Sequence, residues 1–321
     1  MRQINRTALA IILVNVVLCG ISLALFPLGI GMNPSSAPES GLVELTRYNR
    51  YTTKPAWSPD GRFIVFESQI EDSNPEKYAG HKGELHIIAV DGTHRKRITY
   101  SQRSVGQPAW SPDGQTIAIT DGAHVCLMRT DGSQLYCADA SSAERLAWAP
   151  DGRSLLYDAA SKIYRLAISA EAGQPLAPPA FIHDGTHAVW SPDGNCIAFK
   201  SGDVQIMRAD GSSAVRPFAL EGDAYPFGWS PDGRFLFINR YPPKSIHSQL
   251  SAHRLADGKE FRLTNNQQYH TAPTLSPDGK RIAFHSLRDY GYNLYLMDVR
   301  GLPPPEPNSS RSDCLPSLPG K

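Results

Sequence analysis

The sequence predicts an all-β fold, a six-bladed β-propeller, preceded by a single N-terminal transmembrane helix that acts as a signal anchor. Three observations support this prediction. A tryptophan-centred motif recurs along the chain, an alternating apolar stretch follows each copy, and an apolar segment occupies the first thirty residues. The chain also contains 26 Gly and 26 Pro, which indicates many tight turns and therefore short strands rather than long helices.

The recurring motif has the form WSPDG and occurs six times. Its copies begin at residues 57, 110, 148, 190, 229 and 275, with Ala149 in place of the serine and Leu275 in place of the tryptophan. Proline fixes φ, aspartate accepts local backbone N–H bonds and glycine takes the left-handed conformation, so each SPDG is expected to join two antiparallel strands. This turn chemistry makes the six aspartates structural rather than catalytic. The tryptophan ends the first strand, where it is expected to wedge between neighbouring sheets.

The apolar stretches after the motif predict the second strand of each repeat, and the spacing of roughly 40 residues suits four strands per repeat, as in a propeller blade. The closure of the ring is also predicted. Thr99 and Thr264 stand eleven residues before a motif copy, and Thr46 has the same spacing to the first copy. Residues 43–46 are therefore expected to be the outer strand of the sixth blade, paired with residues 294–299.

The two ends of the chain differ from the repeats. Arg2 and Arg6 precede an apolar run over residues 8–26, which is long enough to span a bilayer as a helix. We expect a cytoplasmic stub with a transmembrane anchor or signal peptide at residues 1–31, a linker at 32–42, the propeller at 43–301 and a disordered Pro/Ser-rich tail at 302–321. The positive-inside rule then places the propeller outside the cytoplasm, membrane-anchored, or secreted if the segment is cleaved.

Cys126 and Cys137 flank one predicted hairpin around Asp131-Gly132. A two-residue turn makes them directly opposed, within reach of a disulfide, and an exported domain meets oxidising conditions. A three-residue turn with Gly132 in the left-handed conformation shifts the register and loses the pairing. The disulfide is the expectation, with the alternative register left open.

The repeat, of the form W-S-P-D-G-x-x-I-A-F followed by a strand and a DG turn, resembles that of the TolB-like six-bladed β-propeller family. Residues 190–199 and 275–284 are close to this pattern, and the resemblance covers residues 43–301. It implies a six-bladed ring and an extracytoplasmic binding role. TolB proper carries an α/β domain before its propeller and is a soluble periplasmic protein, so the chain is expected to resemble TolB without being TolB itself.

We expect a non-enzymatic binding module for a protein or cell-envelope ligand. No G-x-S-x-G motif occurs, and the six blades leave no residues of this sequence from which an α/β-hydrolase sheet could be built. The alternative is a lyase or hydrolase that acts on a polysaccharide through the loop face of the propeller. No cofactor or metal site is predicted, since the two histidines at 183 and 187 lie in a loop and lack further ligands. A net charge of +1 gives no reason to expect nucleic acid, and we expect a monomer.

The ligand is expected on the face opposite the SPDG turns, where the longer loops lie. The aromatic and basic residues predicted to form the binding surface there are Tyr78, His81, Arg145, His187, Tyr225, Tyr241, His270, Arg288 and Tyr290. Nearer the axis, the residue three before each motif is expected to approach the central channel: Lys54, Gln107, Arg145, His187, Pro226 and Ala272. Polar residues that end each second strand are expected to line a water-filled channel without binding anything: Glu67, Thr120, Asp158, Lys200, Asn239 and His285.

Overall fold

A computed structural model of the protein describes residues 41–46, 51–68, 83–100, 105–140, 142–169, 177–264, 269–288 and 291–304. These residues belong to one compact unit, Pro38–Lys321. The predicted anchor and most of the predicted linker fall outside the described residues, as does the tail from residue 305. The described part of the chain contains no helix that is both long and apolar enough to cross a membrane.

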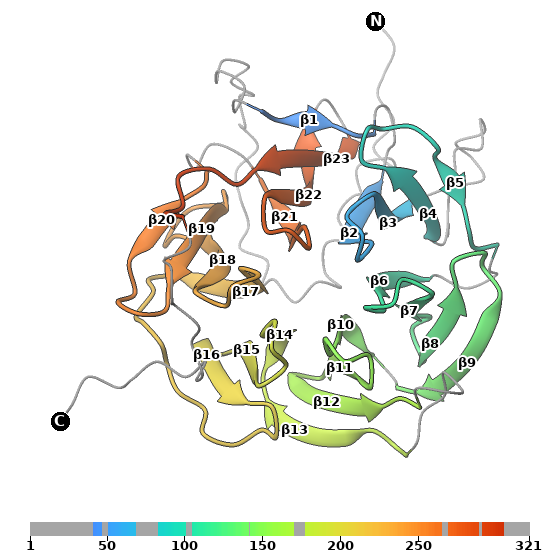
Figure 1. The fold of residues 1–321 in the computed structure, drawn as a ribbon, viewed down its shortest axis with the longest axis horizontal. Coiled ribbons are helices and arrows are strands. Elements are labelled where there is room, and N and C mark those ends of the chain that lie inside the picture. Colours follow the sequence, from blue (N-terminus) through green and yellow to red (C-terminus); the bar gives the residue numbers. More distant parts are fainter. Residues whose placement is uncertain are drawn as a thin grey trace, which may run out of the picture. The chain divides into compact units, whose positions relative to one another are not determined.

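The described strands form six antiparallel sheets arranged around a central opening (Figure 1). The first three blades comprise β2 (Thr52–Trp57), β3 (Phe63–Ser68), β4 (Glu84–Ala89) and β5 (Lys96–Arg97); β6 (Gly106–Trp110), β7 (Thr116–Thr120), β8 (His124–Arg129) and β9 (Gln134–Asp139); and β10 (Glu144–Trp148), β11 (Ser154–Ala159), β12 (Lys162–Ala167) and β13 (Ala180–Asp184). The last three comprise β14 (Thr186–Trp190), β15 (Cys196–Ser201) and β16 (Asp203–Arg208); β17 (Asp223–Trp229), β18 (Phe235–Tyr241), β19 (Gln249–Arg254) and β20 (Glu260–Arg262); and β21 (Thr271–Leu275), β22 (Arg281–Arg288), β23 (Gly291–Asp298) and β1 (Val43–Glu44). The six-bladed all-β prediction is confirmed.

The N-terminal strand closes the ring in the predicted way. β1 pairs antiparallel with β23, so that Val43 lies opposite Leu296, and the Leu45 N–H donates to the Leu294 carbonyl at 2.8 Å. The Leu294 N–H donates in turn to Thr46 Oγ1 at 3.0 Å. Thr99 and Thr264 accept the same bond from Leu85 and Leu250 in their own blades, which explains the common spacing of these threonines.

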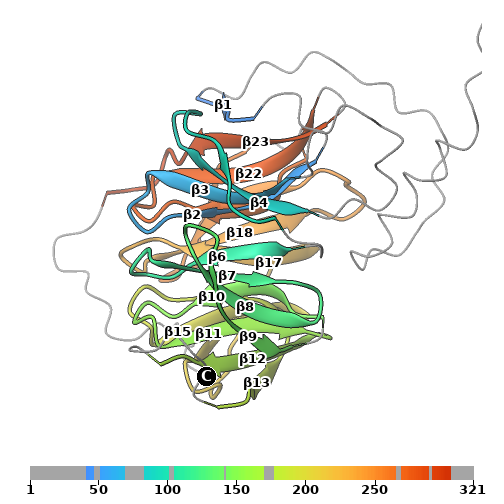
Figure 2. The same ribbon diagram turned by 90° about the vertical axis from the view of Figure 1, so that its right-hand side faces the viewer.

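Each SPDG segment forms the expected turn between the first and second strands. In the first copy, Ser58 Oγ donates to Asp60 Oδ1 at 2.6 Å, and the same carboxylate oxygen accepts the Arg62 N–H at 3.0 Å. Gly61 has φ = 67°, a conformation that side chains disfavour. These bonds hold the pKa of Asp60 at about 2, with the Ser58 hydrogen bond as the largest cause. The turns of several blades lie together on one side of the ring (Figure 2).

The motif tryptophans lie between blades and bond to the blade before them. Trp148 Nε1 donates to the Ala109 carbonyl at 3.1 Å, and Trp190 Nε1 donates to the Ala147 carbonyl at 3.2 Å. Trp57 and Trp229 make equivalent bonds to the carbonyls of Thr274 and Val189. The hydrophobic core also lies between sheets, as where apolar residues of β7 and β8 pack against those of β11 and β12. Apolar burial between neighbouring sheets therefore joins one blade to the next.

The fourth blade differs from the prediction of four strands per repeat. Among the described residues its sheet contains only β14, β15 and β16, and a single bridge between Ile206 and Val215 stands where a fourth strand would pair. Pro217 follows two residues after Val215. Because proline has no N–H to donate to the ladder, the pairing stops after this bridge.

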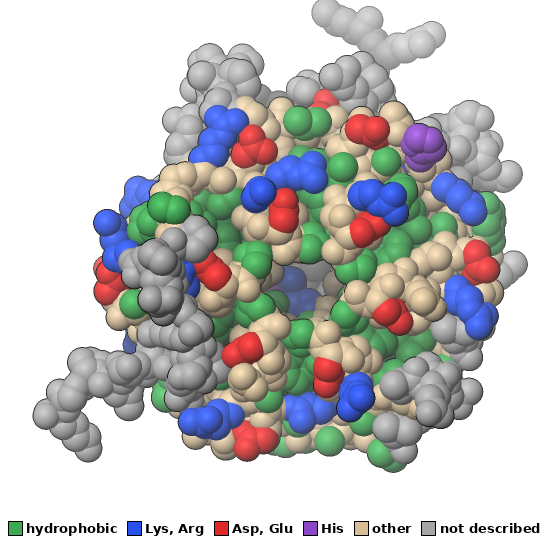
Figure 3. Space-filling view, in the orientation of Figure 1, with side chains coloured by type: hydrophobic (Ala, Val, Ile, Leu, Met, Phe, Trp, Pro, Cys, Tyr) green, Lys and Arg blue, Asp and Glu red, His purple; other side chains and the backbone are tan. Residues whose placement is uncertain are grey.

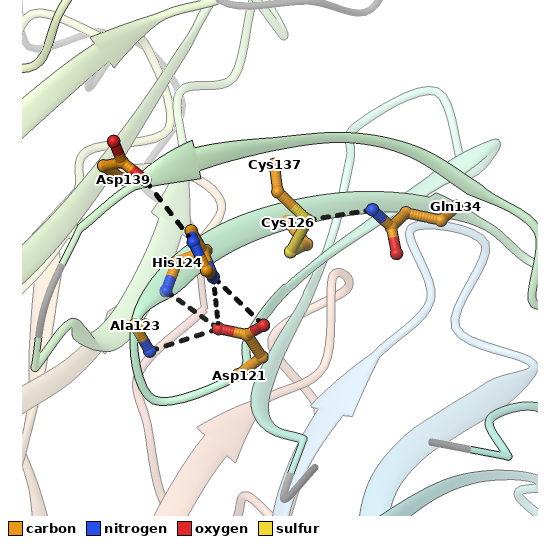
Figure 4. Close-up of a disulfide and its surroundings, with 7 residues drawn as sticks. All are labelled: Asp121, Ala123, His124, Cys126, Gln134, Cys137 and Asp139. Atoms are coloured by element: carbon orange, nitrogen blue, oxygen red, sulfur yellow. Dashed lines mark hydrogen bonds and ion pairs between the residues drawn. A yellow bond between two sulfur atoms is a disulfide. The ribbon is translucent and has the colours of Figure 1, made fainter. Parts of the chain in front are cut away.

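A disulfide joins Cys126 on β8 to Cys137 on β9, with the two Cα atoms 4.0 Å apart (Figure 4). The turn itself is not the two-residue turn expected. The Arg129 N–H donates to the Ser133 carbonyl and Gly132 has φ = 97°, so the loop has three residues and the register shifts by one next to it. A bulge at Leu135 then adds a residue to β9 and restores the register in which the cysteines oppose each other.

Candidate functional site

The inner strand of each blade carries a β-bulge where it approaches the axis on the loop side. Five residues at the bulges have left-handed backbone with φ between 44° and 58°, and none is glycine: Lys54, Gln107, Arg145, His187 and Ala272. The fifth blade has Pro226 at this position, whose ring fixes φ near −65°, and its bulge falls between Pro226 and Gly228. A non-glycine residue held in this region costs of order 1 kcal/mol or more, and such strain gathers at functional sites.

The bulges bring two sets of side chains together around the channel. Each bulge residue is followed thirteen positions later by a polar residue in the last part of the second strand of the same blade. The Lys54 N–H donates to His285 Nδ1 at 3.4 Å, and the His187 N–H donates to Asp158 Oδ2 at 3.4 Å. Both bonds run from a bulge to the second strand of the preceding blade. We call this ring of residues the channel mouth.

Three cations belong to the channel mouth, and Figure 3 shows Lys and Arg side chains inside the central opening. Lys54 Nζ lies 3.0 Å from Glu67 Oε2, and Lys200 Nζ lies 2.8 Å from Asp223 Oδ1. Arg145 is exposed and, within the part of the chain that the structure describes, forms neither a hydrogen bond nor an ion pair. Its guanidinium is therefore the unpaired cation among these three.

The charge of Arg145 acts on groups from four blades, one of which is Tyr241 in the fifth blade. Burial lowers the pKa of His187 to about 2 and that of His285 to about 3, and Arg145 contributes to both shifts by repulsion. Burial raises the pKa of Asp158 to about 7 although Arg145 opposes the shift. At neutral pH the channel mouth thus holds two uncharged imidazoles and a carboxyl group whose pKa is raised into the neutral range.

Aromatic rings continue from the channel mouth along the fifth blade. The ring of His187 lies 4.4 Å from that of Tyr225, and Tyr225 lies 6.1 Å from Tyr241, measured between centroids. Tyr241 in turn lies 6.3 Å from Tyr269. Lys200 Nζ stands 4.7 Å from the centre of the Tyr225 ring. These half-buried rings form an apolar wall, and the charge of Arg145 acts on two of its members, His187 and Tyr241.

Four of the predicted binding residues meet at this place: Arg145, His187, Tyr225 and Tyr241. Tyr78, His81 and Tyr290 lie outside the described residues, as does the side chain of Arg288, whose backbone ends β22. His270 requires a correction. It is 0% exposed and packs against Phe284 with ring centres 4.7 Å apart, and its backbone is bonded to Ser248 and Asn239 of the fifth blade, so its side chain is closed off from a ligand.

Sequence reasoning assigned the second-strand residues to a channel that binds nothing, and it left Asp158 and Lys200 out of the site. The constant thirteen-residue spacing placed each of them in the same blade as a bulge residue, but it gave no sign of their contacts with the next blade, where Asp158 accepts from the His187 N–H and Lys200 pairs with Asp223. The side chains of His183 and His187 do not face a common point. His183 Nδ1 contacts the Asp184 carbonyl, whereas the His187 ring packs against that of Tyr225. In the described ranges no group of three or more His, Cys, Asp or Glu side chains is placed to hold a metal ion.

Similar proteins were found by sequence. No family model matches the chain. Dipeptidyl-peptidase 5 of Porphyromonas gingivalis is 25% identical over 293 residues, which covers 83% of this chain and 42% of that protein. The Tol-Pal system protein TolB of Francisella tularensis subsp. mediasiatica is 23% identical over 255 residues, covering 78% and 49%. The uncharacterized peptidase YuxL of Bacillus subtilis is 26% identical over 163 residues, covering 50% and 23%. The chain therefore spans half or less of the length of these relatives.

Solved structures agree on the fold. TolB from Acinetobacter baumannii aligns with a TM-score of 0.60 and 18% identity, covering 74% of this chain and 64% of that one. An oligogalacturonate lyase in complex with manganese aligns with a TM-score of 0.54 and 14% identity, covering 82% and 94%. The chain is therefore a TolB-like six-bladed β-propeller. The low identity to TolB fits the expectation that it is not TolB itself.

The same comparisons correct the expectation of a chain without enzymatic function. Two of the relatives found by sequence are named as peptidases, and a structural neighbour is a lyase. The absence of a G-x-S-x-G motif argued only against an α/β-hydrolase. Similar propellers occur in proteins that are named as peptidases or lyases.

Proposed function

We propose that the channel mouth is the ligand-binding site of an extracytoplasmic propeller that recognises a protein or a cell-envelope glycan. The observation that carries the proposal is Arg145. Its guanidinium is exposed beside the channel, has no partner among the described residues, and stands on a strained left-handed residue with φ = 45°. Strain and unsatisfied charge are features that proteins keep where a ligand supplies the missing contacts.

The aromatic wall supports this proposal. Tyrosines are enriched where proteins recognise ligands, because they combine a large apolar ring with a hydroxyl group and few rotatable bonds. Tyr225 lies 6.1 Å from Tyr241, and the charge of Arg145 reaches Tyr241, so a bound ligand meets apolar area and charge in the same region.

We also propose that the propeller is held at a membrane through its N-terminal segment. The apolar run over residues 8–26 and the two arginines before it favour a tether with the propeller outside the cytoplasm. The TolB relatives, which are periplasmic proteins, are consistent with this location.

The test is cross-linking of the full chain to its ligand in native membranes, followed by capture of the complex. We expect the double variant Arg145→Ala, Tyr225→Ala to lose the captured ligand. The matched control is Arg62→Ala, Gln115→Ala, two exposed residues after the SPDG turns on the opposite side. Arg234 is unsuitable as a control, because its side chain is only 11% exposed and bonds to the Pro303 carbonyl. Loss of the ligand in the control but not in the first variant would show that the site is on the turn side.

A second candidate function is cleavage of a polysaccharide at the same place, and one observation favours it. Burial raises the pKa of Asp158 to about 7, which suits a carboxyl group that donates or accepts a proton near neutral pH. The assay is release of fragments from acidic and neutral polysaccharides, with and without a chelator. Activity that Asp158→Asn abolishes would support this function, and activity that survives the substitution would contradict the role of Asp158.

A further inference from the structure

The three cations of the channel mouth differ in what neutralises them. Lys54 faces the Glu67 carboxylate and Lys200 faces that of Asp223, both within 3.0 Å. Arg145 has no such counter-ion among the described residues. A planar guanidinium with free N–H groups matches a carboxylate, to which it donates two parallel hydrogen bonds.

The Asp158 carboxyl group offers a second unsatisfied contact. Asp158 is 3% exposed. Its Oδ2 atom accepts a long hydrogen bond from the His187 N–H, whereas its Oδ1 atom has no hydrogen-bond partner in the described structure. The charged and titratable groups around it are Arg145 and Glu144 on β10 and His187 on β14. On β12, Ile163 lies opposite Asp158, and Lys162 pairs with the next residue along. A buried polar atom without a partner costs about 1–3 kcal/mol, which a bound ligand can recover.

We propose that Arg145 and Asp158 form a receptor for a single carboxylate, the terminal carboxylate of a polypeptide that enters the channel mouth. The guanidinium of Arg145 pairs with the ligand carboxylate. Asp158 in its neutral form donates the O–H on Oδ1 to one oxygen of the same carboxylate. This inference rests on the proposed function and names the ligand group for that site.

The arrangement favours a chain end over a polyanion. An acidic polysaccharide carries a carboxylate on successive residues, so its recognition calls for several cations in a row. In the described channel mouth, the charges of Lys54 and Lys200 are already balanced, which leaves one positive group for one carboxylate. Tyr225 and Tyr241 provide an apolar wall for the last side chain of the peptide.

The receptor links binding to protonation. Asp158 titrates with a pKa of about 7 in the free protein, and a second carboxylate beside it favours the neutral form further. Binding therefore takes up a proton above pH 7. The affinity is expected to be constant between about pH 5 and pH 6, where the ligand carboxylate is still charged, and to fall by up to about tenfold for each pH unit above 7.

The experiment uses the immobilised full chain and a pool of random hexapeptides with free C-terminal carboxylates, compared with the same pool as C-terminal amides. We expect the free acids to be retained at pH 6 at least about tenfold more than the amides. Arg145→Ala removes this preference without new backbone strain, since Ala272 takes the same left-handed conformation in the sixth blade. Asp158→Asn abolishes the pH dependence, because an amide donates at any pH. Arg62→Ala on the turn side is the control and retains the preference.

Equal retention of acids and amides, or a preference that survives in Arg145→Ala, overturns the receptor. Retention of a trigalacturonate probe in place of the peptides shows an acidic glycan ligand instead and also overturns it. If either result accompanies loss of the membrane ligand in Arg145→Ala, Tyr225→Ala, the channel mouth remains the binding site and only the assigned ligand group is wrong. If that double variant keeps its membrane ligand, both proposals fail.

Discussion

Replacement of Trp148 by Phe tests whether the indole N–H groups join the blades. In the folded protein Trp148 Nε1 donates to the Ala109 carbonyl of the preceding blade at 3.1 Å. Phenylalanine keeps an aromatic ring at the interface but has no donor. The carbonyl then loses its partner inside the interface, a loss that costs about 1–3 kcal/mol in addition to the smaller ring.

The chain contains a matched control for this substitution. Trp110 occupies the same position in the second blade and is also half-buried, yet its Nε1 has no hydrogen-bond partner among the described residues. Trp110→Phe removes the same ring area without breaking a bond. We expect Trp148→Phe to lower the free energy of unfolding by about 1–2 kcal/mol more than Trp110→Phe does. Urea unfolding followed by circular dichroism measures both values, and equal losses would refute the role of the bond.

Three further predictions concern the closure, the disulfide and the channel mouth. Deletion of residues 1–41 should leave the stability of the propeller intact, whereas deletion of residues 1–46 removes β1 with the buried Leu45 and should lower the midpoint of thermal unfolding; equal midpoints would contradict the closure. Loss of the disulfide in Cys126→Ser, Cys137→Ser should cost roughly 2–4 kcal/mol in urea unfolding, and an unchanged value in oxidised protein would show that the bond contributes nothing. Burial raises the folded-state pKa of Asp158 to about 7 from 3.8, so its contribution to stability is fully present below pH 3.8 and is lost as the pH rises to 7. The free energy of unfolding of Asp158→Asn, relative to that of wild type, should therefore be higher at pH 8 than at pH 3.5. Urea unfolding at both pH values measures this difference, and the reverse order would be inconsistent with the shifted pKa.

Some features of the fold follow from contacts between neighbours in the sequence. In the SPDG turn, Ser58 bonds to Asp60 two residues away, and Gly61 takes a conformation that few residues accept. Because these interactions are local, the motif alone predicted the turns, the number of blades and the direction of each strand pair. The common threonine spacing predicted the closure for the same reason, since each threonine accepts one bond at a fixed place in its blade.

Other features depend on the balance of several weak preferences. The three-residue turn at Gly132 shifts the register of β8 and β9, and a bulge at Leu135 shifts it back, so two departures from the expected hairpin cancel at the cysteines. In the fourth blade, Pro217 prevents a fourth strand after one bridge, although the preceding Val215 has high β-propensity. A periodic pattern indicates that strands exist, and it carries little information about where a ladder slips or stops.

The sequence by itself determined the architecture of this protein, because its repeated motif specifies turns and strands through contacts a few residues apart. It also placed Arg145 and His187 near the channel, from their fixed distance before each motif. Only the tertiary structure decided which of these groups meet. Arg145 acts on Asp158 in its own blade and on His187, Tyr241 and His285 in three others, which are distant in the chain. Burial and pairing at the channel mouth are properties of the closed ring, since the desolvation that shifts these pKa values arises only when all the blades surround one axis.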